Sequence, residues 1–516
     1  MLSRLIVGAL AMASGLLAAP SSEFRQPLSR DEKILHALNR LTFGPRPGDV
    51  ERVKALGLKK WIKLQLHPKS IPENPALAAK LRPLDTLGMS PAEMMEHYPA
   101  PRAAKAGDLA TIVSAEQART LRSGTPQEKL ALFTSLDPER QGHVLEAVGQ
   151  KIRMDLYAAA SGDMRRRIEV ASGARQVVAR DLADAKLYRA LYSNRQLEEV
   201  LTDFWYNHFN VYLEKGADHY LVTAFERDAI RPYVLGKFRD LLRATAQNPA
   251  MLFYLDNWQS TGEQSPAGQR RHSGLNENYG RELLELHTLG VDGGYTQKDV
   301  TEVARCFTGW TIRQPQRVAE FQFNPKMHDV GEKIVLGTRI PAGGGIEDGF
   351  RVLDVLARHP ATAHFIARQL AIRFVADDPP EPLVKRMAAT FLKKDGELRA
   401  VMETMLKSPE FWSRGAYRSK LKSPLEMVAS SLRALDAQAD FAFGLENQLR
   451  QLGEPLYAKA EPTGYSNVGR DWINSAALLA RMNFSLALEN NSIPGVRVAS
   501  QPGEGVRLGS PEFQRK

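Results

Sequence analysis

The residues best suited to chemistry gather in one short segment, from Asn276 to Trp310. Glu282 and Glu285 lie one turn apart on an expected helix, so both carboxylates can reach a single point. There they can share a proton or hold a cation, and Arg281 can keep one of them ionised. The alternative is a solvated helix face with an Arg–Glu surface pair, which contributes about 0.3–0.5 kcal/mol. The full polar stripe, at i, i+3, i+4 and i+7, is Asn278, Arg281, Glu282 and Glu285.

Two histidines from other parts of the chain can supply a base or a metal ligand to these carboxylates. His208 lies in an expected helix rich in aromatic residues, where Asp203 and Asn207 form a neighbouring polar stripe. The alternative for His208 is a hydrogen-bonded core residue. His328 precedes Asp329 at an expected turn, where the aspartate can instead simply cap the turn. Carboxylates and neutral imidazoles together suit a divalent metal ion.

Helix signals on both sides of a glycine turn would position the polar stripe. Asn276 can cap a helix over about residues 277–289, because its side chain can accept a hydrogen bond from the first turn. Gly290 is a suitable stop, since glycine readily adopts the positive φ angle of a helix end. Thr296, followed three residues later by Asp299, resembles a capping box for a second helix.

Apolar residues recur at helical spacing through most of the remaining chain, which predicts a mostly α, multi-helical globular fold. The best candidate for β structure is a short hairpin near 321–337, in which FQFNP and KIVLG flank the turn MHDVGE. The polar stretch 259–274 predicts a loop, and with it a candidate sub-division of the helical domain. Glycine, proline and arginine are frequent after residue 490, so residues 491–516 are expected to be disordered.

The first 19 residues have the composition of a secretory signal peptide. Arg4 supplies a positive charge, an apolar stretch follows over residues 5–17, and Ala18 and Ala19 are small, as at cleavage sites. No later stretch approaches about 18 consecutive apolar residues, so no transmembrane span is expected after signal cleavage. We therefore expect an exported protein, periplasmic or extracellular.

Composition sets further limits on function. Cys306 is the only cysteine among 516 residues, which excludes an intramolecular disulfide and a cysteine-rich metal site. The net charge of +10 favours an acidic partner, such as an anionic envelope polymer, or serves solubility alone. Nucleic acid is not expected as a partner, because the signal peptide directs the chain out of the cytoplasm.

Motifs along nearly the whole chain resemble the DUF1800 family of large bacterial proteins of unknown function. Besides Asn276–Trp310, the resemblance is carried by HALNRLTFGP at 36–45, DFWYNHFNVY at 203–212, MLFYLDN at 251–257, HDVGEKIVLG at 328–337, HPATAHFIARQLAIRFVADDPP at 359–380, SPEFW at 408–412 and WINSAALLARMNF at 472–484. It covers residues 30–490 and implies one mostly helical, exported domain. It also implies a partner, because family members are often found beside an exported DUF1501 protein that resembles the alkaline-phosphatase and sulfatase group. The resemblance supplies no catalytic residue.

Two functions from different classes remain open on the sequence. The first is an exported helical accessory or binding protein that acts with a DUF1501-type envelope partner. The second is a hydrolase with a carboxylate–histidine site that can hold a divalent metal ion. We expect such a site where the helix near 276–289 meets the 203–212 helix and the 328–337 turn. Its catalytic candidates are Glu282, Glu285, Arg281, His208 and His328.

Overall fold

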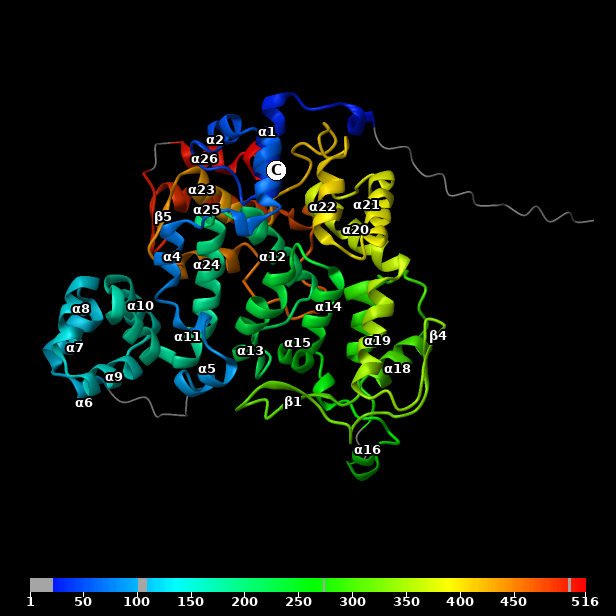
Figure 1. Ribbon diagram of the computed structural model, residues 1–516. Helices are drawn as coiled ribbons and strands as arrows, with labels where there is room; N and C mark the ends of the chain where they lie inside the picture. The colour runs from blue at the N-terminus through cyan, green and yellow to red at the C-terminus, as the bar shows by residue number, and fades with distance from the viewer. Residues whose placement is uncertain (1–21, 101–108, 272–273, 500–502) are drawn as a thin grey trace, which may run out of the picture.

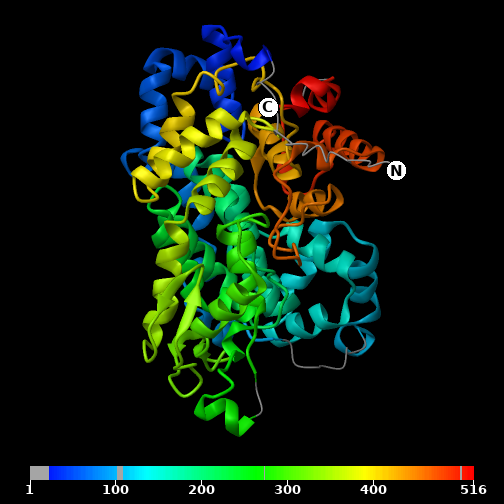
Figure 2. The ribbon, with the colours of Figure 1, turned by 90° about the vertical axis from the view of Figure 1, so that its right-hand side faces the viewer.

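The structure is a computed structural model that describes residues 22–100, 109–271, 274–499 and 503–516. The expected signal peptide, residues 1–19, lies outside the described residues. Figures 1 and 2 show an elongated helical body with a smaller helical lobe at one side. The prediction of a mostly α fold is confirmed, because the described strands form only two-stranded sheets between many helices. A helix with the length and apolar character of a membrane span is not found in the described part of the chain.

The body is built from helices of both ends of the chain. Several begin at side-chain caps; Ser423, for example, forms a capping box with Glu426 at the start of α23. The N-terminal helices are α1 (Arg30–Leu41), α2 (Asp49–Leu56), α3 (Leu58–Gln65), α4 (Pro75–Leu81) and α5 (Pro91–His97). The central helices are α11 (Gly162–Tyr192), α12 (Gln196–His208), α13 (Asp218–Ala224), α14 (Phe238–Gln247), α15 (Pro249–Tyr254), α16 (Pro266–Arg271), α17 (Asn278–Glu282) and α18 (Gln297–Cys306). The later helices are α19 (Ile346–Ala357), α20 (Pro360–Phe374), α21 (Glu381–Lys393), α22 (Leu398–Leu406), α23 (Pro424–Ala434), α24 (Phe443–Gln451), α25 (Ser475–Glu489), α26 (Glu504–Gly509) and α27 (Pro511–Gln514).

The lobe has a hydrophobic core of its own. It consists of α6 (Leu109–Ile112), α7 (Ala115–Ser123), α8 (Pro126–Ser135), α9 (Pro138–Ala147) and α10 (Gln150–Ala159).

 Leu121, Phe133, Val144 and Leu156 pack together inside the lobe, apart from the main core. The long helix α11 joins the lobe to the body and is interrupted by non-helical backbone at Gly173.

One large apolar core runs through the body. It includes residues from both sides of the stretch 259–274, such as Leu252 and Leu283, so this core does not divide there. Part of the stretch forms α16, and its backbone is tied to a later loop. The Gly262 N–H donates to the carbonyl of Met327 at 2.8 Å.

The pairing predicted for residues 321–337 is wrong, although both predicted strands exist. β2 (Glu320–Phe323) pairs with the strand that precedes it, β1 (Trp310–Arg313). β3 (Lys333–Val335) pairs with the strand that follows it, β4 (Thr338–Ile340), and both pairs are antiparallel. The β3–β4 loop is Leu336-Gly337, and both residues have positive φ angles. A two-residue turn of this type matches the natural twist of a hairpin, so it forms in place of the longer loop around MHDVGE. A third pair joins β5 (Gln438–Ala439) to β6 (Val496–Arg497).

The first helix of the Asn276–Trp310 segment changes its winding halfway. α17 continues into the π-helix η7 (Leu283–Thr288), where the Leu289 N–H donates to the carbonyl of Leu284 at 2.8 Å. The Asn276 side chain accepts a hydrogen bond from the Asn278 N–H at 2.8 Å, at the helix start. π-Helical turns inside helices are rare and often mark functional sites.

The second helix of the segment starts as predicted. Thr296 and Asp299 form both hydrogen bonds of a capping box at the start of α18. Gly290, between the helices, has a φ of 84°. An added Cβ there would lie 2.8 Å from the ring of Phe365, so both backbone and packing favour glycine. Cys306 is buried at the end of α18.

The disorder expected for residues 491–516 does not describe the resolved part of this stretch. Residues 496–497 form β6, and α26 and α27 follow within 503–516. Lys516 is buried, and its ammonium contacts the carboxylate of Glu426. The composition suggested disorder, but contacts with distant helices supply the missing apolar and ionic partners.

Candidate functional site

In the predicted polar stripe on α17 and η7, Asn278 is exposed, and the other three side chains are half-buried. The Tyr295 hydroxyl donates a hydrogen bond to Glu285 at 3.1 Å. Arg281 forms its ion pair with Glu277, at 3.5 Å. Burial raises the pKa of Glu282, and the negative charge of Glu285 raises it further, while Arg281 offsets part of this rise. The two carboxylates therefore repel each other, and Arg281 forms its ion pair with Glu277 and not with either of them.

His208 is half-buried at the end of α12, where its ring packs against the main core. Its Nε2 lies 3.1 Å from the carbonyl oxygen of His287, and the centroids of the two rings are 6.4 Å apart. Trp205 and Phe209 pack edge-on against the His208 ring. Burial lowers the pKa of His208 to about 4 and that of His287 to about 3. Both imidazoles are therefore neutral near pH 7.

His328 belongs to a different buried cluster. Its Nε2 lies 3.2 Å from Oδ2 of Asp348, and Nζ of Lys333 lies 2.7 Å from the same oxygen. The side chains of Lys333 and Asp348 are both 0% exposed. Burial alone would raise the pKa of Asp348, but the hydrogen bonds from His328 and Lys333 lower it overall. This cluster joins the β3–β4 hairpin to α19.

The structure thus separates the predicted site residues by their contacts. His208 touches the helix of Glu282 and Glu285 through the backbone carbonyl and the ring of His287, and His328 contacts Asp348 instead. Among the residues that the structure describes, no hydrogen bond or ion pair joins either histidine to either glutamate. In the same part of the chain, no group of three or more His, Cys, Asp or Glu side chains is arranged to hold a metal ion. The carboxylate–histidine site stays a prediction.

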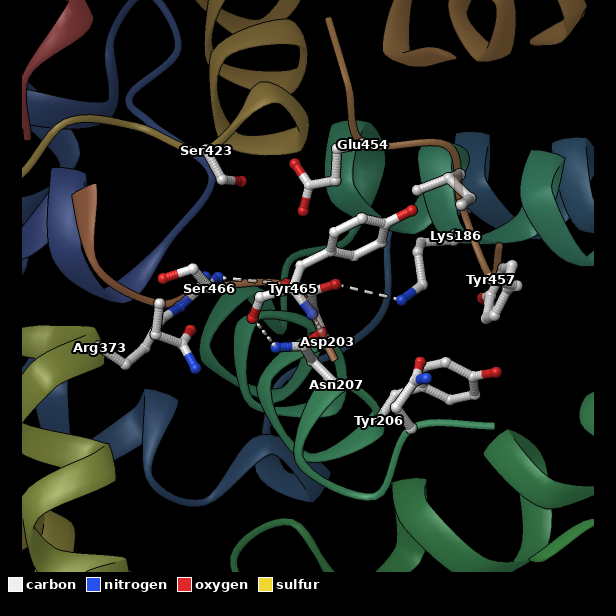
Figure 3. A pocket seen from close by; sticks show the side chains of 13 residues that line it. Lys186, Asp203, Tyr206, Asn207, Arg373, Ser423, Glu454, Tyr457, Tyr465 and Ser466 are labelled. Carbon is white, nitrogen blue, oxygen red and sulfur yellow. Dashed lines mark hydrogen bonds and ion pairs between the residues drawn. The ribbon is translucent and has the colours of Figure 1, made fainter. Parts of the chain in front are cut away.

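A polar cavity, which the sequence did not reveal, lies where α11, α12 and α20 meet the loop after α24 (Figure 3). The space open to the centre of a water-sized sphere is about 30 Å³. One water molecule requires roughly 10–15 Å³ by this measure, so the cavity suits water or a ligand of a few atoms. Its lining residues are Lys186, Asp203, Tyr206, Asn207, Asn210, Arg373, Ser423, Glu454, Leu456, Tyr457, Tyr465, Ser466 and Asn467.

Ion pairs between distant segments organise one wall of this cavity. Asp203 of α12 lies 3.1 Å from Lys186 of α11 and 3.2 Å from Arg373 of α20, and Figure 3 shows it between the two. Arg373 also lies 3.0 Å from Glu426. Burial alone would raise the pKa of Glu426, but the positive charges of Arg373 and Lys516 lower it overall. The network therefore holds several charges away from solvent by pairing them.

Glu454 is the exception in this network. In the described chain no ion pair involves Glu454, although its charge interacts with those of Arg373 and Arg481. Its Oε2 accepts a hydrogen bond from the Leu425 N–H at 2.7 Å. Burial raises the pKa of Glu454 to about 7, and the negative charge of Asp203 contributes to the rise. A protonatable carboxyl beside an ion-paired one is an arrangement that can serve acid–base chemistry.

Two asparagines hold the loop that closes the cavity: Asn207 lies in α12, and Asn210 follows shortly after this helix ends. Asn207 donates to the carbonyl of Tyr465 at 2.7 Å and accepts from its N–H at 2.6 Å. Asn210 donates to the carbonyls of Lys459 and Glu461, each at 2.9 Å. Gly464 has a φ of 68°, and an added Cβ would lie 2.2 Å from the Asn207 carbonyl oxygen. The close approach therefore requires glycine.

The sequence carried a partial signal for this cavity. Asp203 and Asn207 stand one turn apart beside the aromatic face of α12, and polar pairs inside an otherwise apolar helix are candidates for buried contacts. Arg373 is a similar candidate, because it lies among apolar residues in α20. Glu454 had no local signal, because only the distant helices around it make it a buried carboxyl.

A second feature lies on the surface, on α25. Four of its apolar side chains are exposed at i, i+1, i+4 and i+8, so they share one face of the helix. The exposed fractions are 47% for Leu478, 60% for Leu479, 55% for Met482 and 44% for Leu486. The opposite side of α25 packs on the protein through Arg481, Phe484 and Leu488. We call these four exposed residues the α25 face.

The fold and these features define a mostly helical protein with a buried charged cavity and an exposed apolar helix face. The chain belongs to the DUF1800 family, described as a protein of unknown function, whose family model matches residues 36–511. No match was found among curated proteins or among solved structures.

Proposed function

We propose that this protein is an exported accessory protein of the cell envelope that binds a partner protein through the α25 face. Contiguous exposed apolar residues favour a protein–protein contact, because burying them removes apolar surface from water. The partner that we propose is an exported DUF1501-type protein, on the basis of the family resemblance. Export itself is proposed from the composition of residues 1–19.

The observation that carries this proposal is the combined exposure of Leu478, Leu479, Met482 and Leu486. Exposed single apolar residues are common, but four on one helix face form a patch. An anionic envelope polymer remains a further proposed partner, since the net charge is +10. Such a polymer would bind cationic surface and would not need the α25 face.

Replacing Leu479 or Met482 by aspartate should weaken binding of the purified DUF1501-type protein at least about tenfold, which equals about 1.4 kcal/mol. Both side chains are more than half exposed, so folding should be unaffected. Isothermal titration calorimetry measures the affinity, and the thermal unfolding midpoint monitors the fold.

The matched control is Leu392→Asp, because Leu392 is a leucine on another helix and is 44% exposed. This control should bind as the unchanged protein does. Equal binding by all three variants would refute a role for the α25 face. If the unchanged protein does not bind the DUF1501-type protein, the proposed partner is wrong.

A hydrolase is the second candidate, and Glu454 is the observation that favours it. Its pKa of about 7 would let it act as a general acid beside Asp203. The candidates from the sequence, Glu282 and Glu285 with Arg281, His208 and His328, form a separate proposed site. Metal analysis of the purified protein, with Glu282→Gln as the control, tests that site. A stoichiometric metal ion that is lost in the variant would support it.

A further inference from the structure

An apolar groove is lined by residues of α1, α3 and α22. Figure 1 labels α1 and α22 at the same end of the body. Its volume is about 730 Å³, within the range of about 300–1,000 Å³ that is usual for small-molecule sites. Leu58, Ile62 and Leu66 line it from α3 and the residue after it. Leu406 of α22 and Trp412 complete the apolar floor.

The Trp412 ring is held in place beside the groove. Its indole N–H donates to the carbonyl of Leu406 at 2.7 Å. Because this hydrogen bond satisfies its one polar group, the ring can present an apolar surface to a ligand. Ile62 and Leu58 are half-buried, so part of each side chain remains open to the groove.

The rim of the groove is strongly cationic. Lys407 is paired with Glu403 at 2.8 Å, and Glu403 is the one acidic residue among the described residues that line the groove. Lys33, Lys59 and Lys63 also line it. Over the described residues, none of these three lysines forms an ion pair with a carboxylate, as the ion pairs of this end join other residues. An apolar floor is thus bordered by uncompensated positive charge.

We propose that this groove binds a single-chain anionic amphiphile, such as a fatty carboxylate or an alkyl phosphate, as a free molecule. The acyl chain would lie on Leu58, Ile62 and Trp412, where burial of methylene groups stabilises it. The acidic head group would lie among Lys33, Lys59 and Lys63, which attract it by charge. A neutral apolar ligand leaves the lysines unused, and a polyanion leaves the apolar floor unused. This proposal does not depend on the α25 face.

Titration with dodecyl phosphate below its micelle concentration tests the proposal on the full mature protein. We expect one saturable site by isothermal titration calorimetry and affinity at least about tenfold weaker for dodecanol, which lacks the charge. The double variant Lys59→Glu/Lys63→Glu should lose about tenfold or more in affinity for dodecyl phosphate, with dodecanol unchanged. Both lysines are exposed, so this variant should fold normally.

The matched control is Lys326→Glu/Lys394→Glu, which changes the net charge equally at exposed lysines outside the groove. It should bind dodecyl phosphate as the unchanged protein does. A second variant, Ile62→Ser, should weaken both ligands because it removes apolar floor. The proposal is overturned if binding is not saturable, if dodecanol binds equally well, or if both double variants behave alike. Binding to vesicles of anionic phospholipid without binding to monomeric dodecyl phosphate would also overturn it.

Discussion

Replacing Lys333 by methionine is expected to lower the free energy of unfolding by roughly 3–5 kcal/mol, as found when one partner of a buried ion pair is removed. Nζ of Lys333 lies 2.7 Å from Asp348, and both side chains are 0% exposed. Without the ammonium, His328 is the one side chain of the described residues that still forms a hydrogen bond with Asp348. Its Oδ1 already lacks a hydrogen bond in the described structure, so the uncompensated charge would be costly.

Urea unfolding followed by circular dichroism measures this loss. Arg339→Met is the matched control on the same hairpin, because Arg339 pairs with Glu332 at an exposed surface. Surface pairs contribute only about 0–1 kcal/mol, so this control should change little. The double variant Lys333→Met/Asp348→Leu should recover much of the lost stability, since it removes both charges together. A loss below about 1 kcal/mol for Lys333→Met alone would contradict the buried pair.

Glu454→Gln is expected to remove a strong pH dependence of stability. Burial raises the pKa of Glu454 from 4.5 to about 7 in the folded protein. Between these two values, the folded protein binds a proton that the unfolded chain has released, so stability falls as pH rises. The full effect is about 3 kcal/mol, from about 1.4 kcal/mol for each unit of pKa difference.

The comparison uses urea unfolding of both proteins at several pH values from 4.5 to 7.5. The stability of the unchanged protein relative to Glu454→Gln should fall by that amount across the range. Glu446, whose burial also raises its pKa to about 7, is present in both proteins, so its effect cancels in the difference. A pH-independent difference would show that Glu454 titrates as an ordinary exposed carboxyl.

Local rules predicted the helices and their ends well. The capping box of Thr296 and Asp299 and the stop at Gly290 depend on hydrogen bonds and φ angles within a few residues. The β pairing failed for the opposite reason. Short apolar stretches indicate that strands exist, but partner choice depends on turn geometry and on neighbours. Leu336 and Gly337, with positive φ angles, form the tight turn of the observed hairpin. Its first strand is therefore the second strand of the predicted one.

The candidate site shows the same division. The residue types at Glu282 and Glu285 predicted interacting carboxylates, and the charge of Glu285 does raise the pKa of Glu282. The sequence did not predict the π-helix that carries Glu285, nor the separate cluster of His328 with Asp348. Whether two charges from distant segments meet depends on packing, which residue spacing does not contain.

The Asn276–Trp310 segment and the other motifs determined, by themselves, the family and the mostly helical fold, because both follow from local pattern and motif order. Only the tertiary structure decided where the buried charges lie. Asp203, Arg373 and Glu454 come from segments far apart in the chain and become one cavity wall when the helices pack. Burial then sets the electrostatics, since the same carboxyl group is ordinary in water and strongly perturbed when desolvated.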